Sequence, residues 1–158
     1  MADNYVSSRE VLPFIYTVDI SLGLTQTGTK TLVLGSDSEF ELYGFTARTN
    51  ADNASQAAGT INGSSANSNA LQTPDCFKVL IKDISTGRDL FTNAVSRAMI
   101  CGNTSNFFLA EGYRIRFPRQ NQLQFDFTCL YSAAFPAGLT ALDITLGLRG
   151  YKIFGRMG

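Results

Sequence analysis

The stretch NQLQFDFTCLY, residues 121–131, alternates apolar and polar side chains without interruption. Its apolar positions are Leu123, Phe125, Phe127, Cys129 and Tyr131. A period of two places these side chains on one face of an extended strand and the Gln, Asp and Thr side chains on the other. The pattern therefore predicts a strand with one face in a core and the other toward solvent.

The same alternation recurs along most of the chain. It is found in segments 14–22, 38–48, 76–84, 111–119 and 141–154, and segment 30–35 is predicted to be a short apolar strand. Turn-forming residues separate most of these segments, and segment 89–102 fits either a short helix or an extended chain. We therefore expect an all-β protein, an antiparallel β-sandwich or jelly roll of about eight strands with at most one short helix.

Glycines interrupt the alternation in two of the predicted strands. After Gly44 the apolar positions shift by one residue, which indicates a β-bulge. A similar shift at Gly150 predicts that Tyr151 and Ile153 continue the core face of the last strand. In the first strand, alternation places Phe14 on the core face.

Residues 51–75, ADNASQAAGTINGSSANSNALQTPD, differ from the chain around them. They contain no Lys, Arg or aromatic residue, and their only large apolar side chains are Ile61 and Leu71. Only three predicted strands precede them, too few for a separate sandwich. We interpret the segment as a long flexible loop inserted in one domain of residues 13–158, preceded by an N-terminal arm of residues 1–12.

Composition excludes several function classes. Thirteen basic residues balance thirteen acidic ones among 158, so no net charge attracts nucleic acid or an anionic membrane. The chain has no histidine, which removes His-dependent nucleophiles and metal sites. Its three cysteines lack paired spacing, and we expect them to be buried free thiols. The expectation is a protein without catalysis, metal or cofactor, made in the cytoplasm because it lacks a signal sequence or membrane span.

Two predicted strands carry opposite charges on their solvent faces. Acidic residues lie at Asp37, Glu39 and Glu41, and basic residues at Arg114, Arg116 and Arg119. Arg149 and Lys152 extend the basic stripe. Arginine pairs in a two-pronged manner with carboxylates and is favoured at interfaces, so these six residues are our candidate contacts between copies or with a charged lattice. An ordinary solvated surface is the alternative interpretation.

Four strand motifs resemble small virion proteins of tailed bacteriophages, many of which are capsid decoration (cement) proteins with β-sandwich or jelly-roll folds. The first motif is Asp37 with Phe40, and the second is the run Phe77, Val79, Ile81 and Asp83. The others are the strand ending at Pro118, which is followed by Leu123, and the closing set Leu148, Gly150, Tyr151 and Phe154. Residues 51–75 lie outside the resemblance.

The resemblance implies a homotrimer bound to the major capsid protein on the outside of the virion head, which it stabilises without catalysis. The N-terminal arm and the loop bearing Ile61 and Leu71 would then be further capsid contacts. Two alternatives remain open at this point. One is a tail, baseplate or fibre-base structural protein, and the other is a carbohydrate- or receptor-binding jelly roll, against which the absence of Trp weighs.

Overall fold

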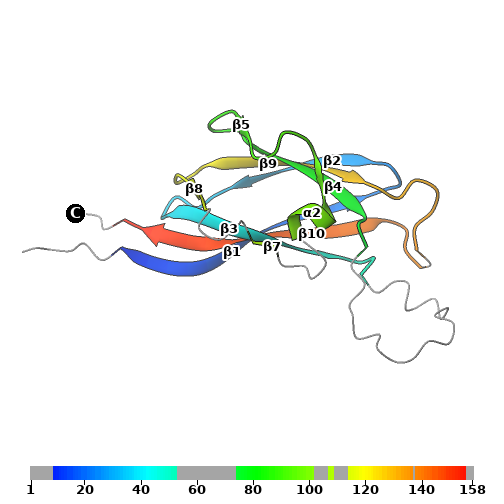
Figure 1. The fold of residues 1–158 in the computed structure, drawn as a ribbon, viewed down its shortest axis with the longest axis horizontal. Coiled ribbons are helices and arrows are strands. Elements are labelled where there is room, and N and C mark those ends of the chain that lie inside the picture. Colours follow the sequence, from blue (N-terminus) through cyan, green and yellow to red (C-terminus); the bar gives the residue numbers. More distant parts are fainter. Residues whose placement is uncertain (1–8, 53–73, 102–106, 109–113, 137, 156–158) are drawn as a thin grey trace, which may run out of the picture.

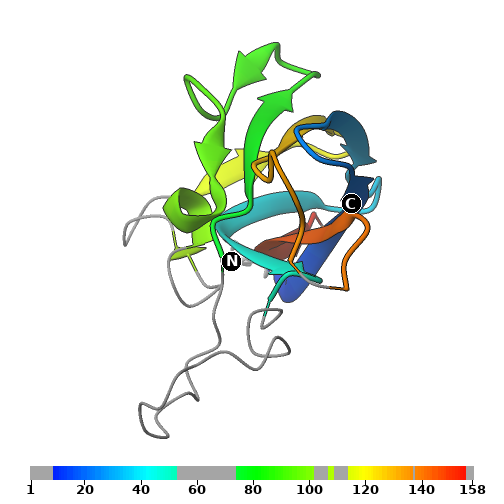
Figure 2. The same cartoon turned by 90° about the vertical axis from the view of Figure 1, so that its right-hand side faces the viewer.

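The computed structural model describes residues 9–52, 74–101, 107–108, 114–136 and 138–155, which form two antiparallel sheets packed face to face (Figure 1). Sheet A contains β1 (Glu10–Leu22), β10 (Leu142–Phe154), β3 (Glu39–Thr49), β7 (Phe107–Phe108) and β8 (Ile115–Phe117). Sheet B contains β2 (Thr27–Val33), β9 (Gln122–Cys129), β4 (Phe77–Asp83), β5 (Arg88–Asp89) and β6 (Val95–Ser96). The view turned by 90° shows the two layers separately (Figure 2).

The strands pair in a nested order. The first pairs with the last, β1 with β10, and then β2 pairs with β9, β3 with β8, and β4 with β6. Successive pairs alternate between the two sheets. This nesting is the connectivity of a jelly roll, so the predicted fold class is confirmed.

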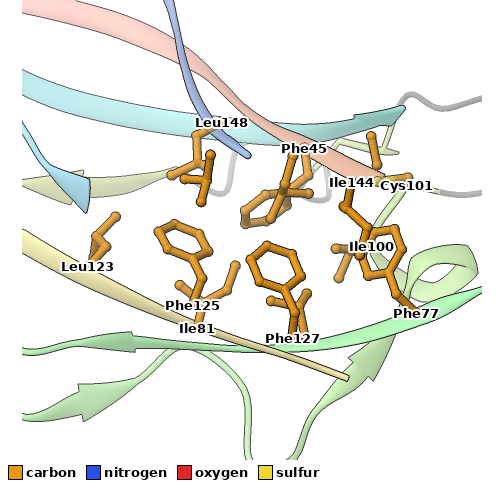
Figure 3. Packing of buried hydrophobic residues seen from close by; sticks show 14 of the residues in the cluster. Phe45, Phe77, Ile81, Ile100, Cys101, Leu123, Phe125, Phe127, Ile144 and Leu148 are labelled. Atoms are coloured by element: carbon orange, nitrogen blue, oxygen red, sulfur yellow. The ribbon is translucent and has the colours of Figure 1, made fainter. Parts of the chain in front are cut away.

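The core lies between the sheets and is lined by the apolar faces that alternation predicts (Figure 3). Phe125 and Phe127 of β9 are fully buried, as is Ile81 of β4 beside them. From sheet A, Phe45 and Leu148 point toward them. Burying such side chains is the main stabilising contribution, at about 1.5–3 kcal/mol each.

The bulge predicted at Gly44 is confirmed, but the phase change predicted at Gly150 is wrong. Arg149 pairs with Gly44 and Gly150 with Leu42, so Tyr43 is the extra residue on β3. Strand β10 itself pairs with β1 without any shift, which leaves Tyr151 facing away from the core. Gly150 occupies the inner position without a side chain because the Phe40 ring fills that space, 2.5 Å from where a Cβ would lie.

The first strand is longer than its pattern predicted and is only partly covered. It begins at Glu10, so Glu10–Leu12 of the expected arm pair with β10. Val18 and Leu22 are buried, whereas Phe14 is 38% exposed despite lying on the inner face. Lys152 shares the inner face there, with its Nζ 4.2 Å from the centre of the Phe14 ring, and Phe14 is not part of the apolar core cluster.

The ambiguous segment 89–102 contains both kinds of structure. Strand β6 is followed directly by the helix α2 (Arg97–Cys101). Within the described part of the chain, no helix is long and apolar enough to cross a bilayer. The three cysteines are buried and free, as predicted.

Most of the predicted loop lies outside the described residues, as do both of its large apolar side chains, Ile61 and Leu71. The strands on either side of it, β3 and β4, belong to different sheets of the same core.

Replacing Gly150→Ala tests the close contact between β10 and β3. The new methyl group would lie 2.3 Å from the Glu41 carbonyl oxygen, so we expect the free energy of unfolding to fall by about 1–3 kcal/mol in urea denaturation. Gly155→Ala is the matched control, because its Cβ would meet only the flexible end of Arg119. Equal stability of the two variants would contradict this packing.

Thiol labelling tests the burial of the cysteines. Burial raises the pKa of the Cys101 thiol to about 12, and it also raises the pKa of Cys76. The reactive thiolate is therefore scarce at pH 8, and we expect the native protein to react with a thiol reagent far more slowly than the urea-unfolded chain. Rapid reaction of the native protein would contradict this placement.

Candidate interaction face

The pairing of β10 determines which side chains leave the core. Its even-numbered residues from Leu142 to Leu148 are buried against sheet B. Directly paired residues share a face, so Ile15 of β1 accompanies Arg149 and Val11 accompanies Ile153 on the other side. We call this side, which points away from sheet B, the outer face of sheet A.

A cluster of tyrosine and arginine side chains lies on the outer face of sheet A. The Tyr43 and Tyr151 rings have centres 5.3 Å apart. The guanidinium carbon of Arg114 lies 5.4 Å from the centre of the Tyr151 ring, and that of Arg149 lies 5.7 Å from the centre of the Tyr43 ring. Tyr43 follows Glu39 and Glu41 on the outward positions of β3 and is also the extra residue of the bulge, after which Phe45 returns to the core face. Alternation alone did not predict this cluster.

The acidic and basic stripes predicted from the sequence are brought together within one chain. β3 and β8 are neighbours, and Arg116 Nε lies 2.9 Å from Glu39 Oε2. Arg114 Nη1 donates a hydrogen bond of 2.7 Å to Glu41 Oε1. This hydrogen bond raises the pKa of Arg114 above its usual value. These contacts are exposed and contribute little stability, but they neutralise the two stripes against each other.

The remaining predicted contact residues are more scattered. Asp37 precedes β3, and its carboxylate is 3.5 Å from Lys152 Nζ. Lys152 thus lies on the inner side of sheet A, on the opposite face from Arg149, so the two do not form one basic stripe. Arg119 follows β8, with its Nη2 3.0 Å from the position of a Cβ on Gly155.

A buried arginine that the sequence analysis did not single out connects the two ends of the undescribed segment 53–73. The Arg97 side chain is 2% exposed and donates to both carboxylate oxygens of Asp52, at 2.5 and 2.9 Å. It also donates to the carbonyl oxygens of Ala47 at 3.0 Å and Pro74 at 3.4 Å. Asp52 and Pro74 flank the segment, so this arginine fixes the distance between its ends.

The charge of Arg97 is stabilised by its carboxylate partner. Burial opposes the ionisation of Asp52, but hydrogen bonds from Arg97 and Thr49 outweigh it, and the pKa of Asp52 lies below its usual value. Burial likewise disfavours charged Arg97, whereas Asp52 raises the pKa of Arg97. No local sequence signal could have revealed the pair, because its members are 45 positions apart.

A polar hollow of about 400 Å³ adjoins Asp52 at one end of sheet A. It is lined by Arg48, Thr49, Asn50, Asp52, Asp143 and Thr145. Asp143 accepts a hydrogen bond from Asn50 Nδ2 at 3.2 Å, and Asp52 is held by Arg97. The described residues that line the hollow include no aromatic side chain on which a sugar ring could stack, so the hollow gives no specific support to carbohydrate binding.

No metal centre is apparent in the parts of the chain that the structure describes. These residues contain no group of three or more Cys, Asp or Glu side chains arranged to hold an ion. Asp75 accepts a hydrogen bond from the backbone of Ala98, and Asp83 accepts one from Asn121 Nδ2. Asp89 is an exposed residue of β5. The carboxylates of Asp75 and Asp83 therefore have separate structural contacts.

Replacing Asp52→Asn tests the Arg97 pair. At pH 7 we expect the free energy of unfolding to fall by about 2 kcal/mol, less than for a fully buried pair because Asp52 is partly exposed. The pKa of Asp52 is lower in the folded protein than in the unfolded chain, where it is about 4. The ionised carboxylate therefore contributes its full share to the free energy of unfolding above about pH 4. This contribution is lost as the pH falls through the pKa of the folded state.

The difference between wild type and Asp52→Asn should therefore shrink below about pH 4 in urea denaturation. Asp37→Asn is the matched control, since that carboxylate is exposed and we expect no measurable change in stability. A difference that stays constant down to pH 2 would contradict the role given to the Asp52 charge.

The chain was compared with protein-family models, curated proteins and solved structures. No protein-family model, curated protein or solved structure matches the chain.

Proposed function

We propose that this protein is a structural virion component that binds the outside of a phage capsid lattice and stabilises the head through the outer face of sheet A. The observation that carries the proposal is the cluster of Tyr43, Tyr151, Arg149 and Arg114 on that face, beside the exposed apolar side chain of Ile15. Tyrosine and arginine are enriched among the residues that dominate binding energy at protein interfaces.

The charge distribution favours a protein partner over a nucleic acid. The basic residues Arg114 and Arg116 are paired with Glu41 and Glu39, so they do not form a positive stripe for phosphates. Only 16% of the residues are charged, which suits a surface that becomes covered by partners. Ion pairs beside a tyrosine cluster can orient a neighbouring protein without a net field.

The fold and the strand motifs support the same class of function by analogy. Jelly rolls are common in viral capsid proteins and also in lectins, so the architecture alone does not decide the function. The resembling motifs mostly place core residues, for example Phe77 and Val79, which are fully buried. These motifs therefore support a shared fold, whereas evidence for the function has to come from surface residues.

Head stabilisation would arise from added interface. Each copy would bury the outer face of sheet A across a joint between capsid subunits, and a standard interface buries about 1,600 Å² in total. In the homotrimer that the resemblance implies, the second and third contacts are intramolecular and raise the avidity.

Co-sedimentation with expanded phage heads that lack their decoration tests the proposal. We expect the wild-type protein to pellet with the heads and Tyr151→Ser to lose at least about tenfold in affinity, because the variant removes one ring of the cluster. Thr128→Ser on the opposite side of the molecule, in sheet B, is the control and should bind normally. Absence of wild-type binding at any salt concentration would refute the proposal.

A further inference from the structure

The first strand has a free edge with exposed apolar side chains on both of its faces. β1 is the terminal strand of sheet A and pairs only with β10 among the described residues. Val11 and Ile15 on its outer face are 49% and 51% exposed, and Leu12 and Phe14 on its inner face are 46% and 38% exposed. A partner docked on one face of the sheet would cover only half of these side chains, whereas a strand added at the edge would contact all four.

The corresponding edge of sheet B has different chemistry. β2 is the edge strand there, and its outward side chains include Thr27, Thr29 and Thr31. Its inward position opposite Phe125 is occupied by Lys30, and an inward-pointing charge is a common protection against unwanted edge pairing. Residues 11–15 of β1 contain no charged side chain.

The pairing of β10 with β3 determines which N–H and C=O groups of β1 point toward β10 and which point toward the free edge. Asn50 N–H donates to Asp143 O at 3.2 Å, so odd-numbered residues of β10 bond toward β3 and even-numbered ones toward β1. The even-numbered residues of β1 therefore bond β10, while Val11 and Ile15 direct N–H and C=O groups to the free edge. Pro13, which has no N–H, also lies on this free side, where proline is tolerated.

We propose that β1 pairs antiparallel with β1 of a second copy, centred on Phe14. This register places Ile15 opposite Pro13 and Leu12 opposite Tyr16, so apolar side chains meet on both faces. It also places Arg9 opposite Asp19, two exposed residues of opposite charge. The Ile15 N–H of each copy would donate to the Pro13 carbonyl of the other.

The neighbouring registers that preserve the backbone bonding are less favourable. Centring on Pro13 would oppose two prolines, neither of which has an N–H to donate. Centring on Ile15 would place Val11 opposite the Asp19 carboxylate and remove the charge pair. The Phe14 register is therefore the one selected by apolar contact, backbone bonding and charge together.

This pairing is independent of the capsid proposal, which rests on the outer face and implies a trimer. The two-fold contact joins two sheets A edge to edge and makes a dimer, or an even-numbered assembly if trimers also form. If the protein forms the dimer but does not bind capsids, only the capsid proposal fails. If it binds capsids as a monomer or trimer, only the β1 pairing fails.

Light scattering of the full chain over a range of concentrations tests the pairing. We expect a concentration-dependent dimer, weakened about tenfold by Arg9→Asp and restored by the double change Arg9→Asp with Asp19→Arg, which returns opposite charges in the swapped order. Ile15→Lys should weaken it further, whereas Thr31→Lys on the β2 edge should leave it unchanged. A wild-type monomer or trimer, or a double change that fails to restore pairing, would overturn the proposal.

Cross-linking tests the register directly. Phe14 would face Phe14 of the second copy in a non-hydrogen-bonded pair, where Cα atoms lie about 4.5 Å apart and a disulfide can close. Under mild oxidation we expect Phe14→Cys to form a covalent dimer much faster than Thr31→Cys, while the three native thiols are buried. Equal rates for the two variants would contradict the register.

Discussion

The uninterrupted alternation of β10 is the constraint on which the rest of the molecule depends. This strand pairs with β1 along 13 residues and with β3 on its other side. It thereby determines which side chains enter the core, which reach the outer face of sheet A, and which backbone groups of β1 stay at the free edge. The bulge at Tyr43 lets β3 follow this strand past Gly150, where Phe40 fills the inner space.

Among the described residues, the acidic and basic stripes pair with each other. Glu39 and Glu41 meet Arg116 and Arg114 on adjacent strands, so the stripes that looked available for contacts between copies already contact each other. In the interior, Arg97 and Asp52 form the one buried ion pair among the described residues. What the outer face offers a partner is therefore aromatic and apolar area with a balanced polar border, as in many protein interfaces.

Alternation in the sequence was sufficient to predict the all-β class, the core faces of β4 and β9 and the bulge after Gly44, because side-chain direction in a strand follows from position. It failed at Gly150, since a missing side chain in the inner row looks like a change of phase. It could not reveal the Tyr43–Tyr151 cluster or the Arg97–Asp52 pair, because both depend on which distant segments the topology brings together. The proposed contact roles of Ile61 and Leu71 stay predictions, because both residues lie outside the described part of the chain.

We propose that the outer face of sheet A is the surface through which this protein binds the phage capsid. Hydroxyl-radical footprinting of the free protein and of protein bound to expanded heads measures the solvent accessibility of individual side chains in the two states. Tyr43 and Tyr151 should be protected in the particle, while Met99, which is 65% exposed on α2, should be labelled equally in both states. Protection of Met99 with unchanged labelling of both tyrosines would contradict the claim.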